Sequence, residues 1–540
     1  MGATATTKAT AAGGVLATLA AAQFLMTLDS SVMNVSMATV ANDVNTSITG
    51  IQTAITLYTL VMATLMITGG KIGSLIGRRR AFSIGCVIYG CGSFVTGIAT
   101  SLPVLLLGWS FLEGVGAALI MPAVVALVAG NFAASERPKA YGLIASAGAI
   151  AVAAGPLIGG AATTYLSWRV VFFGEVIVVV GILALSRLIT DAPVESTAEL
   201  DIVGTLLSIL GLGLAVFGVL KSSEWGWFTP KPGTRSLLGV SMTFWFVVAG
   251  LFVVWLFLLW EHRQESRGHE PLVRPQMLRV QQLNGGLIMF FFQFMLQAGV
   301  FFIVPLYLSV VLQYSAIDTG LRIMPLSVAL LIAAAGIPKL LPRVSPRLVT
   351  RCGLVLMLLG ILALLNSINK SAAVVTVPLL LIGLGIGALA SQLGAVTVSA
   401  VPNEQSGEVG GLQNTATNLG ASLGTALAGS LLIMVLTSSL VSGIQNNPDV
   451  PEEVKSAAGV ELASGVPFLS DSQLRDALTS AGVDAPTTDS IVEENSTARV
   501  DGMNVALAMM ALLAVLSLTF TGRIPDEQSV GDALPEPAVT

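Results

Sequence analysis

Three acidic side chains lie within long apolar stretches of the sequence, where a charge is costly. Asp29 follows Leu28, Glu113 follows a leucine-rich run, and Glu175 lies in a segment rich in valine and phenylalanine. A carboxylate near the middle of a membrane costs about 2.5–3.5 kcal/mol on insertion scales, so such a residue is a functional candidate. Burial disfavours the charged form. A carboxyl group in this setting can therefore take up and release a proton.

Two neighbours extend this set of candidate residues. Trp109 lies four residues before Glu113, on the same face of a helix. An acid beside an aromatic ring suits a lipophilic cation, through charge attraction and a cation–π contact. Asn34 follows Asp29 along the first apolar run. The alternative interpretation is structural: Asp29 and Asn34 form a packing network, and Glu113 hydrogen-bonds a neighbouring helix.

The overall composition requires lipid as the solvent. The chain of 540 residues is 54% hydrophobic and 11% charged, with a mean hydropathy of +0.83. A soluble domain is typically about 25% charged. A water-soluble fold could not hide this much apolar surface. We therefore predict an all-α membrane protein with many spans.

Cysteine, histidine and phosphate-binding motifs give no sign of catalysis. Cys86, Cys91 and Cys352 lie in apolar stretches without disulfide or zinc spacing, and His262 and His269 share one charged linker. The chain contains no Gly-x-x-x-x-Gly-Lys-Ser/Thr phosphate loop. We expect no enzymatic activity, no metal, no cofactor and no nucleic-acid partner. Energy must then come from an ion gradient.

Fourteen apolar runs of about 20 residues divide the chain, and each is long enough to cross a bilayer as a helix. The first run follows Lys8 and could be mistaken for a signal peptide, but it is too long and has no convincing cleavage site. The predicted helices are 13–35, 50–70, 81–100, 103–130, 139–162, 168–187, 202–221, 237–260, 284–308, 317–338, 348–367, 373–399, 411–438 and 500–521.

Most of the 26 lysines and arginines fall in segments on the side of the N-terminus. Because cytoplasmic loops carry an excess of these residues, we expect both termini in the cytoplasm, as an even number of spans requires. The expected cytoplasmic set is Lys8, Lys71, Arg78, Arg79, Arg80, Arg137, Lys139, Arg187, Arg263, Arg267, Arg274, Arg279, Lys339, Arg343, Arg347, Arg351 and Arg523. The expected outer set includes Arg169, Lys221, Lys231, Arg235, Arg322, Lys370, Lys455, Arg475 and Arg499.

A weak internal repeat predicts the domain organisation. Basic residues follow the second run and again the tenth, which corresponds to six helices plus two inserted ones. We predict a cytoplasmic tail at 1–12, a six-helix bundle at 13–187, two inserted helices at 202–260, a cytoplasmic linker at 261–283, a second six-helix bundle at 284–521 and a cytoplasmic tail at 522–540.

The segment 439–499 is polar and acidic and lies between the last two runs, hence outside. It is expected to be a solvated loop, or else a partial cover over the outer vestibule, with short helices at 451–463 and 471–481. The tail after Arg523 is expected to be disordered. The acidic residues are Asp449, Glu452, Glu453, Asp471, Asp476, Asp484, Asp489, Glu493 and Glu494.

Two stretches point to a known family. Residues 28–35 read Leu-Asp-Ser-Ser-Val-Met-Asn-Val, and residues 148–160 contain Gly-Pro-Leu-Ile-Gly-Gly. They resemble the Leu-Asp-x-Thr-x-x-Asn-Val and Gly-Pro-x-x-Gly-Gly signatures of the fourteen-helix drug:proton antiporters of the major facilitator superfamily. The proline is expected to bend its helix, and the glycines to admit another helix closely. The residues of the second motif are Gly155, Pro156, Gly159 and Gly160.

Two further stretches resemble that family but depart from it. Residues 70–80 are similar to its cytoplasmic loop, whose glycines allow a tight turn and whose arginines can hold the two halves together. Ser74 and Leu75 replace an Asp and an Arg, which weakens that role and leaves a positive-inside anchor as the alternative. In residues 105–118, Ser110 and Glu113 stand where the family has Arg and Gln. The loop residues concerned are Gly70, Gly73, Gly77, Arg78 and Arg79.

The resemblance implies a proton-coupled antiporter that exports small amphipathic compounds, such as drugs, antibiotics or lipophilic cations, by alternating access across the plasma or inner membrane. It implies a small-molecule substrate and surrounding lipid as partners, a proton gradient in place of a cofactor, and a monomer. Secondary cavity candidates are Arg322, Gln293, Gln297 and Asn414. For Arg322 the alternative is an interfacial side chain that reaches toward water.

Other functions remain open at this stage. An exporter of lipids or lysolipids, or of a secondary metabolite made by the cell itself, would share the fold and an apolar cavity. A non-transporting sensor or scaffold on the same fold is a different class of protein. Three acids in the membrane would then lower its stability without serving transport. A membrane enzyme would need a cluster of His, Ser or metal ligands that the sequence does not supply.

Overall fold

The computed structural model describes residues 2–132, 137–191, 200–231, 233–269, 271–341, 344–368, 375–401, 406–455 and 468–527. Several predictions concern residues outside these ranges: Arg343, Lys370, most of the helix expected at 451–463 and the end of the C-terminal tail. The side chains of Lys8, Arg137 and Lys139 also lie outside the described part.

The first part of the chain folds into a bundle of long helices. A π-helical segment, η1, interrupts one of them and joins α4 to α5 without a break. The elements are α1 (Gly2–Asp43), α2 (Ile48–Ile76), α3 (Arg78–Gly97), α4 (Leu102–Leu105), η1 (Leu106–Glu113), α5 (Gly114–Asn131), α6 (Arg137–Tyr165), α7 (Arg169–Leu185) and the 3-10 turn η2 (Ser186–Leu188).

The middle and second parts are also helical, apart from one short antiparallel hairpin of β1 and β2. The middle elements are α8 (Ile202–Leu220), α9 (Ser222–Trp225), β1 (Ser236–Leu237), β2 (Val240–Ser241), α10 (Met242–Ser266) and η3 (Pro275–Arg279). The remaining elements are α11 (Gln281–Leu306), η4 (Tyr307–Val311), α12 (Ala316–Leu340), α13 (Pro346–Leu365), α14 (Thr376–Val398), α15 (Ser406–Asn446), α17 (Asp471–Ser480), α18 (Ala485–Phe520) and η8 (Thr521–Arg523).

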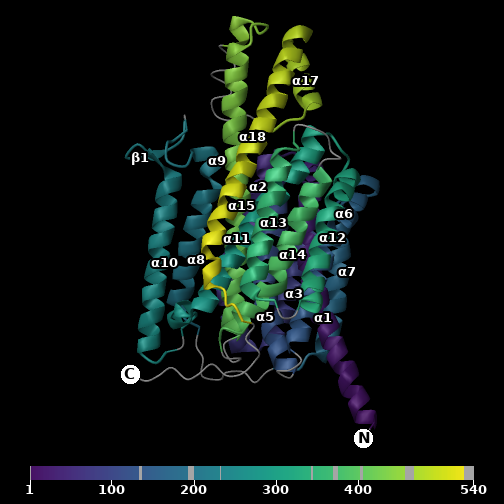
Figure 1. The fold of residues 1–540 in the computed structure, drawn as a ribbon, viewed down its shortest axis with the longest axis vertical. Helices are drawn as coiled ribbons and strands as arrows, with labels where there is room; N and C mark the ends of the chain where they lie inside the picture. Colours follow the sequence, from purple (N-terminus) through teal and green to yellow (C-terminus); the bar gives the residue numbers. More distant parts are fainter. Residues whose placement is uncertain are drawn as a thin grey trace.

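Each of the fourteen predicted runs contains a long helical segment, which confirms the all-α membrane fold. The run predicted at 237–260 starts too early, because its first residues form the β1–β2 hairpin and α10 begins at Met242. Thirteen of these segments, within the described residues, are long and apolar enough to cross a membrane. The fourteenth is α3, which is more polar and packs against α5 and α7. Figure 1 shows that α1 begins and α18 ends at the same end of the bundle, as an even number of spans requires.

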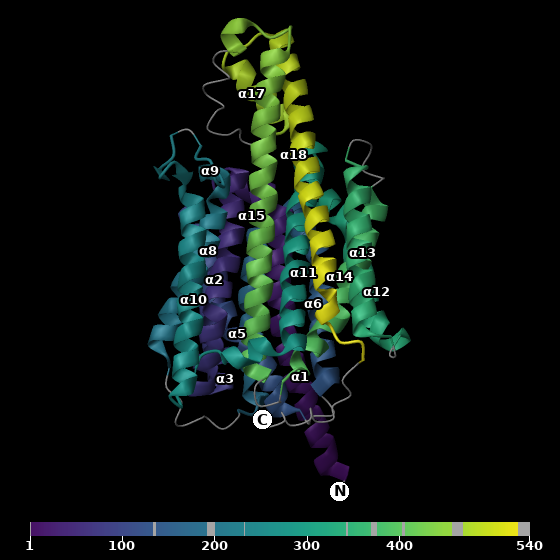
Figure 2. The ribbon, with the colours of Figure 1, turned by 60° about the vertical axis from the view of Figure 1, so that its left-hand side comes forward.

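Two helix pairs make most of the contacts between the first six long helices and the last six: α2 packs against α15, and α6 packs against α12. The helix α5 also packs against α15, and α1 reaches α11 and α12. The inserted helices α8 and α10 pack against each other at one side of the bundle (Figures 1 and 2), and α8 also contacts α2 and α15. The helix α10 continues to Ser266, so the linker predicted to begin at 261 in fact begins inside a helix.

The segment 439–499 is not mainly a loop, contrary to the first expectation. The helix α15 continues to Asn446 and α18 begins at Ala485, so that both extend beyond the bundle (Figures 1 and 2). The predicted short helix at 471–481 is confirmed as α17. The start of α18 is too polar for a membrane span, but its buried Ile491 packs in the same apolar core as Ile444 of α15. Amphipathic packing thus extends both helices.

Candidate functional site

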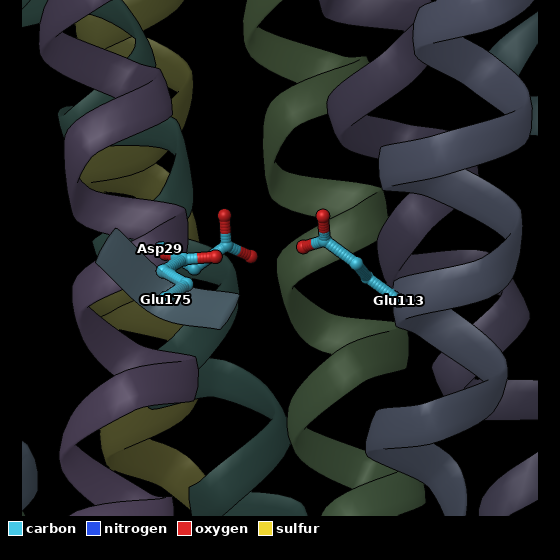
Figure 3. A group of neighbouring side chains, drawn as sticks. All are labelled: Asp29, Glu113 and Glu175. Carbon is cyan, nitrogen blue, oxygen red and sulfur yellow. The ribbon is translucent and has the colours of Figure 1, made fainter. Parts of the chain in front are cut away.

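The three acids predicted from the sequence meet at one place in the first half of the molecule. Asp29 comes from α1, Glu113 from the end of η1 and Glu175 from α7. One carboxylate oxygen of each lies within 4.8 Å of the others, and the three side chains are buried. Figure 3 shows Asp29 and Glu175 facing Glu113 across a narrow space between their helices. We call these three residues the carboxyl triad.

Glycines allow the helices of the triad to come this close. A Cβ atom at Gly92 of α3 would lie 2.6 Å from Glu113 Cγ and 2.8 Å from the carbonyl oxygen of Gly108. The helix α3 and η1 therefore touch through their backbones, as small residues permit in membranes. The π-helical form of η1 places Glu113 at its last position, and such segments are frequent at functional sites.

Neutral side chains donate hydrogen bonds to the triad, and each donor lies on a different element from the acid that it binds. The indole Nε1 of Trp109 donates to both carboxylate oxygens of Asp29, at 2.8 and 3.0 Å. Two hydroxyl groups of α3 donate hydrogen bonds to the glutamates. Ser93 donates to Glu175 Oε2 at 2.9 Å, and Thr96 donates to Glu113 Oε1 at 3.0 Å. These bonds leave Glu113 Oε2 and Glu175 Oε1 buried and without a described hydrogen-bond partner.

Two expectations about neighbours of the acids need correction. Trp109 does not pair with Glu113, because it donates to Asp29 and stacks on Tyr58 of α2, with ring centroids 5.1 Å apart. The π-helical turn changes which residues share a helix face, so the four-residue spacing was misleading. Asn34 donates to the carbonyl oxygen of Ser30 in its own helix, at 2.7 Å, and no described bond joins it to Asp29.

The sequence reasoning missed the neutral residues around the triad, which are Tyr58, Tyr89, Ser93 and Thr96. Tyr89, Ser93 and Thr96 recur at three- and four-residue spacing along α3, and all three are buried. That spacing places them on one face of the helix. A stripe of polar residues along one face of a membrane helix could therefore have indicated that this face of α3 lines the site.

No basic side chain compensates the triad within the described part of the chain. Arg169, which begins the helix of Glu175, instead pairs with Asp43 at 2.8 Å and donates to Ala99 O at 2.7 Å. Two like charges about 4 Å apart repel by about 4 kcal/mol at an effective dielectric constant of about 20. The three carboxyl groups therefore cannot all be ionised together unless a cation joins them. Their oxygens could accept protons or a hard cation.

The Gly-Pro motif lies where three helices meet. A Cβ atom at Gly159 of α6 would lie 3.0 Å from the Cα atom of Val32, and one at Gly155 would overlap the side chain of Ser31. Both contacts are on α1, next to Asp29. On another side of α6, a Cβ atom at Gly320 of α12 would overlap the Pro156 carbonyl. Gly160, also in α6, is buried.

The glycine- and arginine-rich motif is not an extended loop, contrary to expectation. Gly70 and Gly73 lie within α2, and Gly77 alone separates α2 from α3, with a φ of 99°. The described bonds of the arginines stay within the first half. Arg78 Nη1 donates to the Ala126 carbonyl oxygen at 3.4 Å, and the Arg79 backbone N–H donates to Asp191 Oδ1 at 3.1 Å. The expected link between the halves is thus not made by these bonds.

The secondary candidates lie apart from the triad. Gln293 of α11 is buried, and its Oε1 has no hydrogen-bond partner among the described residues. Gln297 is half-buried on the same helix. Asn414 donates to the carbonyl oxygen of Gly410 within α15, at 2.9 Å. Arg322 is exposed near the start of α12, with its guanidinium carbon 5.6 Å from the ring centroid of Tyr314.

Comparison with known proteins gives one consistent family. The model of the Major Facilitator Superfamily matches residues 19–425. The puromycin resistance protein pur8 of Streptomyces alboniger is 31% identical over 420 residues, which are 76% of this chain and 80% of that protein. The tetracenomycin C resistance and export protein of Streptomyces glaucescens is 28% identical over 542 residues. That alignment covers 97% of this chain and 94% of the relative.

A solved structure supports the fold. A bacterial homologue of the human lysosomal transporter Spinster, in an inward-facing and unoccupied conformation, superimposes with a TM-score of 0.56. The alignment has 15% sequence identity and covers 95% of this chain and 98% of that one. At this identity the likeness concerns the fold alone.

Proposed function

The chain belongs to the major facilitator superfamily, and from that premise we propose that it is a proton-coupled antiporter. In this proposal it exports small amphipathic or lipophilic compounds across the cytoplasmic membrane by alternating access. The chain is a multi-pass membrane transporter of that superfamily, and its relatives include drug and antibiotic exporters. The coupling ion, the substrate class and the direction of transport are the proposed part.

The observation that carries the proposal is the carboxyl triad. Three buried carboxyl groups within 4.8 Å, without a described basic partner, must hold protons or another cation to be stable. Ionisable groups inside a membrane bundle are typical of proton relays in transporters. Proton release on one side and uptake on the other would then change the charge of the first half during each cycle.

The names of the relatives support a secondary metabolite or antibiotic as cargo. The relative aligned over 97% of this chain is a resistance and export protein for tetracenomycin C, and another is a probable actinorhodin transporter. A cargo made by the cell itself is therefore the second candidate. It differs from multidrug export in substrate range, and a panel of compounds distinguishes the two.

The test uses purified protein in liposomes with an imposed pH gradient. We expect uptake of a fluorescent lipophilic cation such as ethidium to require the gradient in the wild type. Asp29→Asn and Glu113→Gln should each abolish gradient-driven uptake while insertion stays normal. Glu224→Gln is the matched control, because the ion pair described for Glu224, with Lys221, is exposed and such pairs contribute little. Normal transport by both triad variants, or transport by a sodium gradient instead, would contradict proton coupling at this site.

A further inference from the structure

The carboxyl triad is enclosed by elements of the first half of the molecule. Its walls are α1, α3, η1 and α7, and its donors Ser93 and Thr96 come from α3, which packs against α5 and α7. The halves meet chiefly at α2 with α15 and at α6 with α12. Substrate sites of this fold lie near the midplane between the two repeats. Protonation must therefore be communicated from the triad to that interface.

Trp109 connects the triad to α2. It is buried and donates to both oxygens of Asp29, while its ring lies parallel to that of Tyr58, with an interplanar angle of 4°. A second bond fixes η1 to the same helix, from Ser110 Oγ to the carbonyl oxygen of Ala54 at 2.9 Å. Any shift of the indole is therefore transmitted directly to the middle of α2.

The helix α2 is in turn bonded to the second half, one residue beyond Tyr58. Thr59 Oγ1 and Ser422 Oγ of α15 lie 2.6 Å apart and share a hydrogen bond. Gln52 donates to the carbonyl oxygen of Thr425 at 3.3 Å, within the same contact. The series Asp29, Trp109, Tyr58–Thr59 and Ser422 thus joins the triad to the interface between the halves without a gap.

We propose that Trp109 is the positioning residue that couples protonation of the triad to the contact between α2 and α15. This inference rests on the proposed proton coupling. The N–H donor binds an ionised carboxylate more strongly than a protonated one, because charge-assisted hydrogen bonds are about twice as strong as neutral ones. Protonation of Asp29 therefore loosens the indole, and the Trp109–Tyr58 stack carries that change to α2.

The groups that face Asp29 are acids and hydroxyls, so the charge around Asp29 changes mainly when a proton binds or leaves. Glu113 and Glu175 face it from η1 and α7, and the Tyr89 and Tyr58 hydroxyls lie near it from α3 and α2. No lysine or arginine side chain contributes to this set within the described ranges. Trp109 is thus the principal donor whose bond strength follows the charge of Asp29.

The experiment separates coupling from transport. Trp109→Phe removes the N–H donor and keeps a ring that can stack. Wild type and variant are each measured for gradient-driven ethidium uptake and for ethidium counterflow, an exchange that needs no pH gradient. We expect the ratio of gradient-driven uptake to counterflow to fall at least about tenfold relative to wild type, the size of one lost hydrogen bond to a charged group. A purely structural role would lower both rates together, and that result would overturn the inference.

Two further variants complete the design. Trp260→Phe is the matched control, because Trp260 Nε1 donates to Asp201 at 2.7 Å, far from the triad in the chain. It should leave the ratio of the two rates unchanged. Tyr58→Leu removes the stack, and the double variant with Trp109→Phe should lose no more coupling than the worse single variant. Additive losses would overturn the link through Tyr58.

The outcome also distinguishes this inference from the function on which it rests. A wild type that is indifferent to the pH gradient would refute the proposed proton coupling itself. A wild type that requires the gradient, together with a Trp109→Phe variant that behaves like Trp260→Phe, would keep the proposed function and overturn the role of Trp109.

Discussion

Asp29 accepts one bifurcated N–H bond that both of its oxygens share. Glu113 and Glu175 accept one hydroxyl bond each and keep one buried oxygen unpartnered in the described structure. A buried acceptor without a donor is costly for an ionised carboxylate and less so for a carboxylic acid, which can supply a hydrogen itself. Negative charge is therefore best tolerated at Asp29. The two glutamates are the better places for a resident proton.

The close approach at Gly92 is a residue-scale prediction. Gly92→Ala would place a Cβ atom 2.6 Å from Glu113 Cγ, with backbone atoms of Glu113 and Gly108 at 2.8 Å. We expect a loss of about 1–3 kcal/mol in stability from overpacking, together with lower gradient-driven transport. Thermal unfolding in detergent measures the first effect. Gly174→Ala on α7 is the control, since nothing lies within 4 Å of its added Cβ atom. Equal melting temperatures for the two variants would contradict this packing.

The sequence identified the acids but not their surroundings. Asp29, Glu113 and Glu175 are rare charges in apolar runs, so each is conspicuous by itself. Tyr58 and Ser93 are ordinary residues of membrane helices, and only tertiary packing brings them to the triad. The partner of Trp109 was assigned wrongly because helical periodicity assumes an α-helix, whereas η1 has π-helical geometry.

At the scale of elements, α6 links the surroundings of the triad to the second half, because it packs against α1 beside Asp29 and against α12. Ser327 of α12 also donates to the carbonyl oxygen of Val152 of α6, at 3.0 Å. Under the proposed alternating access, rocking of the two halves would change this contact. Small residues on both helices permit the close approach.

A substitution at Gly320 tests that contact. An added Cβ atom would overlap the Pro156 carbonyl, whose backbone cannot move aside as a flexible side chain could. Gly320→Ala should therefore separate α12 from α6, lower the melting temperature by several degrees and reduce transport with and without a gradient. Gly336→Ala on the same helix is the control, because its Cβ atom would meet only Leu340 Cδ1, at 4.0 Å. A wild-type melting temperature and transport rate for Gly320→Ala would refute the close packing.

The extension formed by α15, α17 and α18 depends on a buried arginine. Arg499 of α18 is fully buried, donates to the carbonyl oxygen of Leu469 at 2.7 Å and pairs with Asp471 of α17. Arg499→Met should cost about 1.5–3 kcal/mol locally, as expected for a lost hydrogen bond to a charged group. Hydrogen exchange in residues 471–480 should then accelerate by at least about tenfold.

The control for that prediction is Arg475→Met. Arg475 pairs with Asp489 on the exposed side of the same extension, and such pairs contribute about 0–1 kcal/mol. Similar exchange rates in the two variants would show that Arg499 does not hold α17 in place.

The positions of the helices could be predicted from the sequence where the length of an apolar run determines where a helix begins and ends. Composition located all fourteen spans, since backbone groups in lipid must be satisfied within each helix. It missed the ends of α15 and α18, because helical structure continues there through amphipathic packing in water. It also ended the second helix at Gly70, whereas α2 continues through Gly73 to Ile76, and only Gly77 has a φ that favours glycine.

At the scale of the whole molecule, the pairing of α2 with α15 and of α6 with α12 relates two halves that the sequence suggested only through a weak repeat. Which helices meet is decided by shape and small residues distributed over both halves, so no local pattern could reveal it. The charges do follow a global pattern. Basic residues gather at the end where α1 begins and α18 ends, and the opposite end bears the acidic extension.

That asymmetry predicts the orientation in the membrane. Cytoplasmic segments carry the excess of lysine and arginine, so the extension must lie outside and the C-terminal end of α10 inside. After replacement of Cys86, Cys91 and Cys352 by serine, a membrane-impermeant maleimide added to intact cells should label Ser480→Cys, at the end of α17. It should label Ser266→Cys only after permeabilisation. Both serines are exposed, so accessibility in the fold does not differ. The reverse pattern would contradict the predicted orientation and place the acidic extension in the cytoplasm.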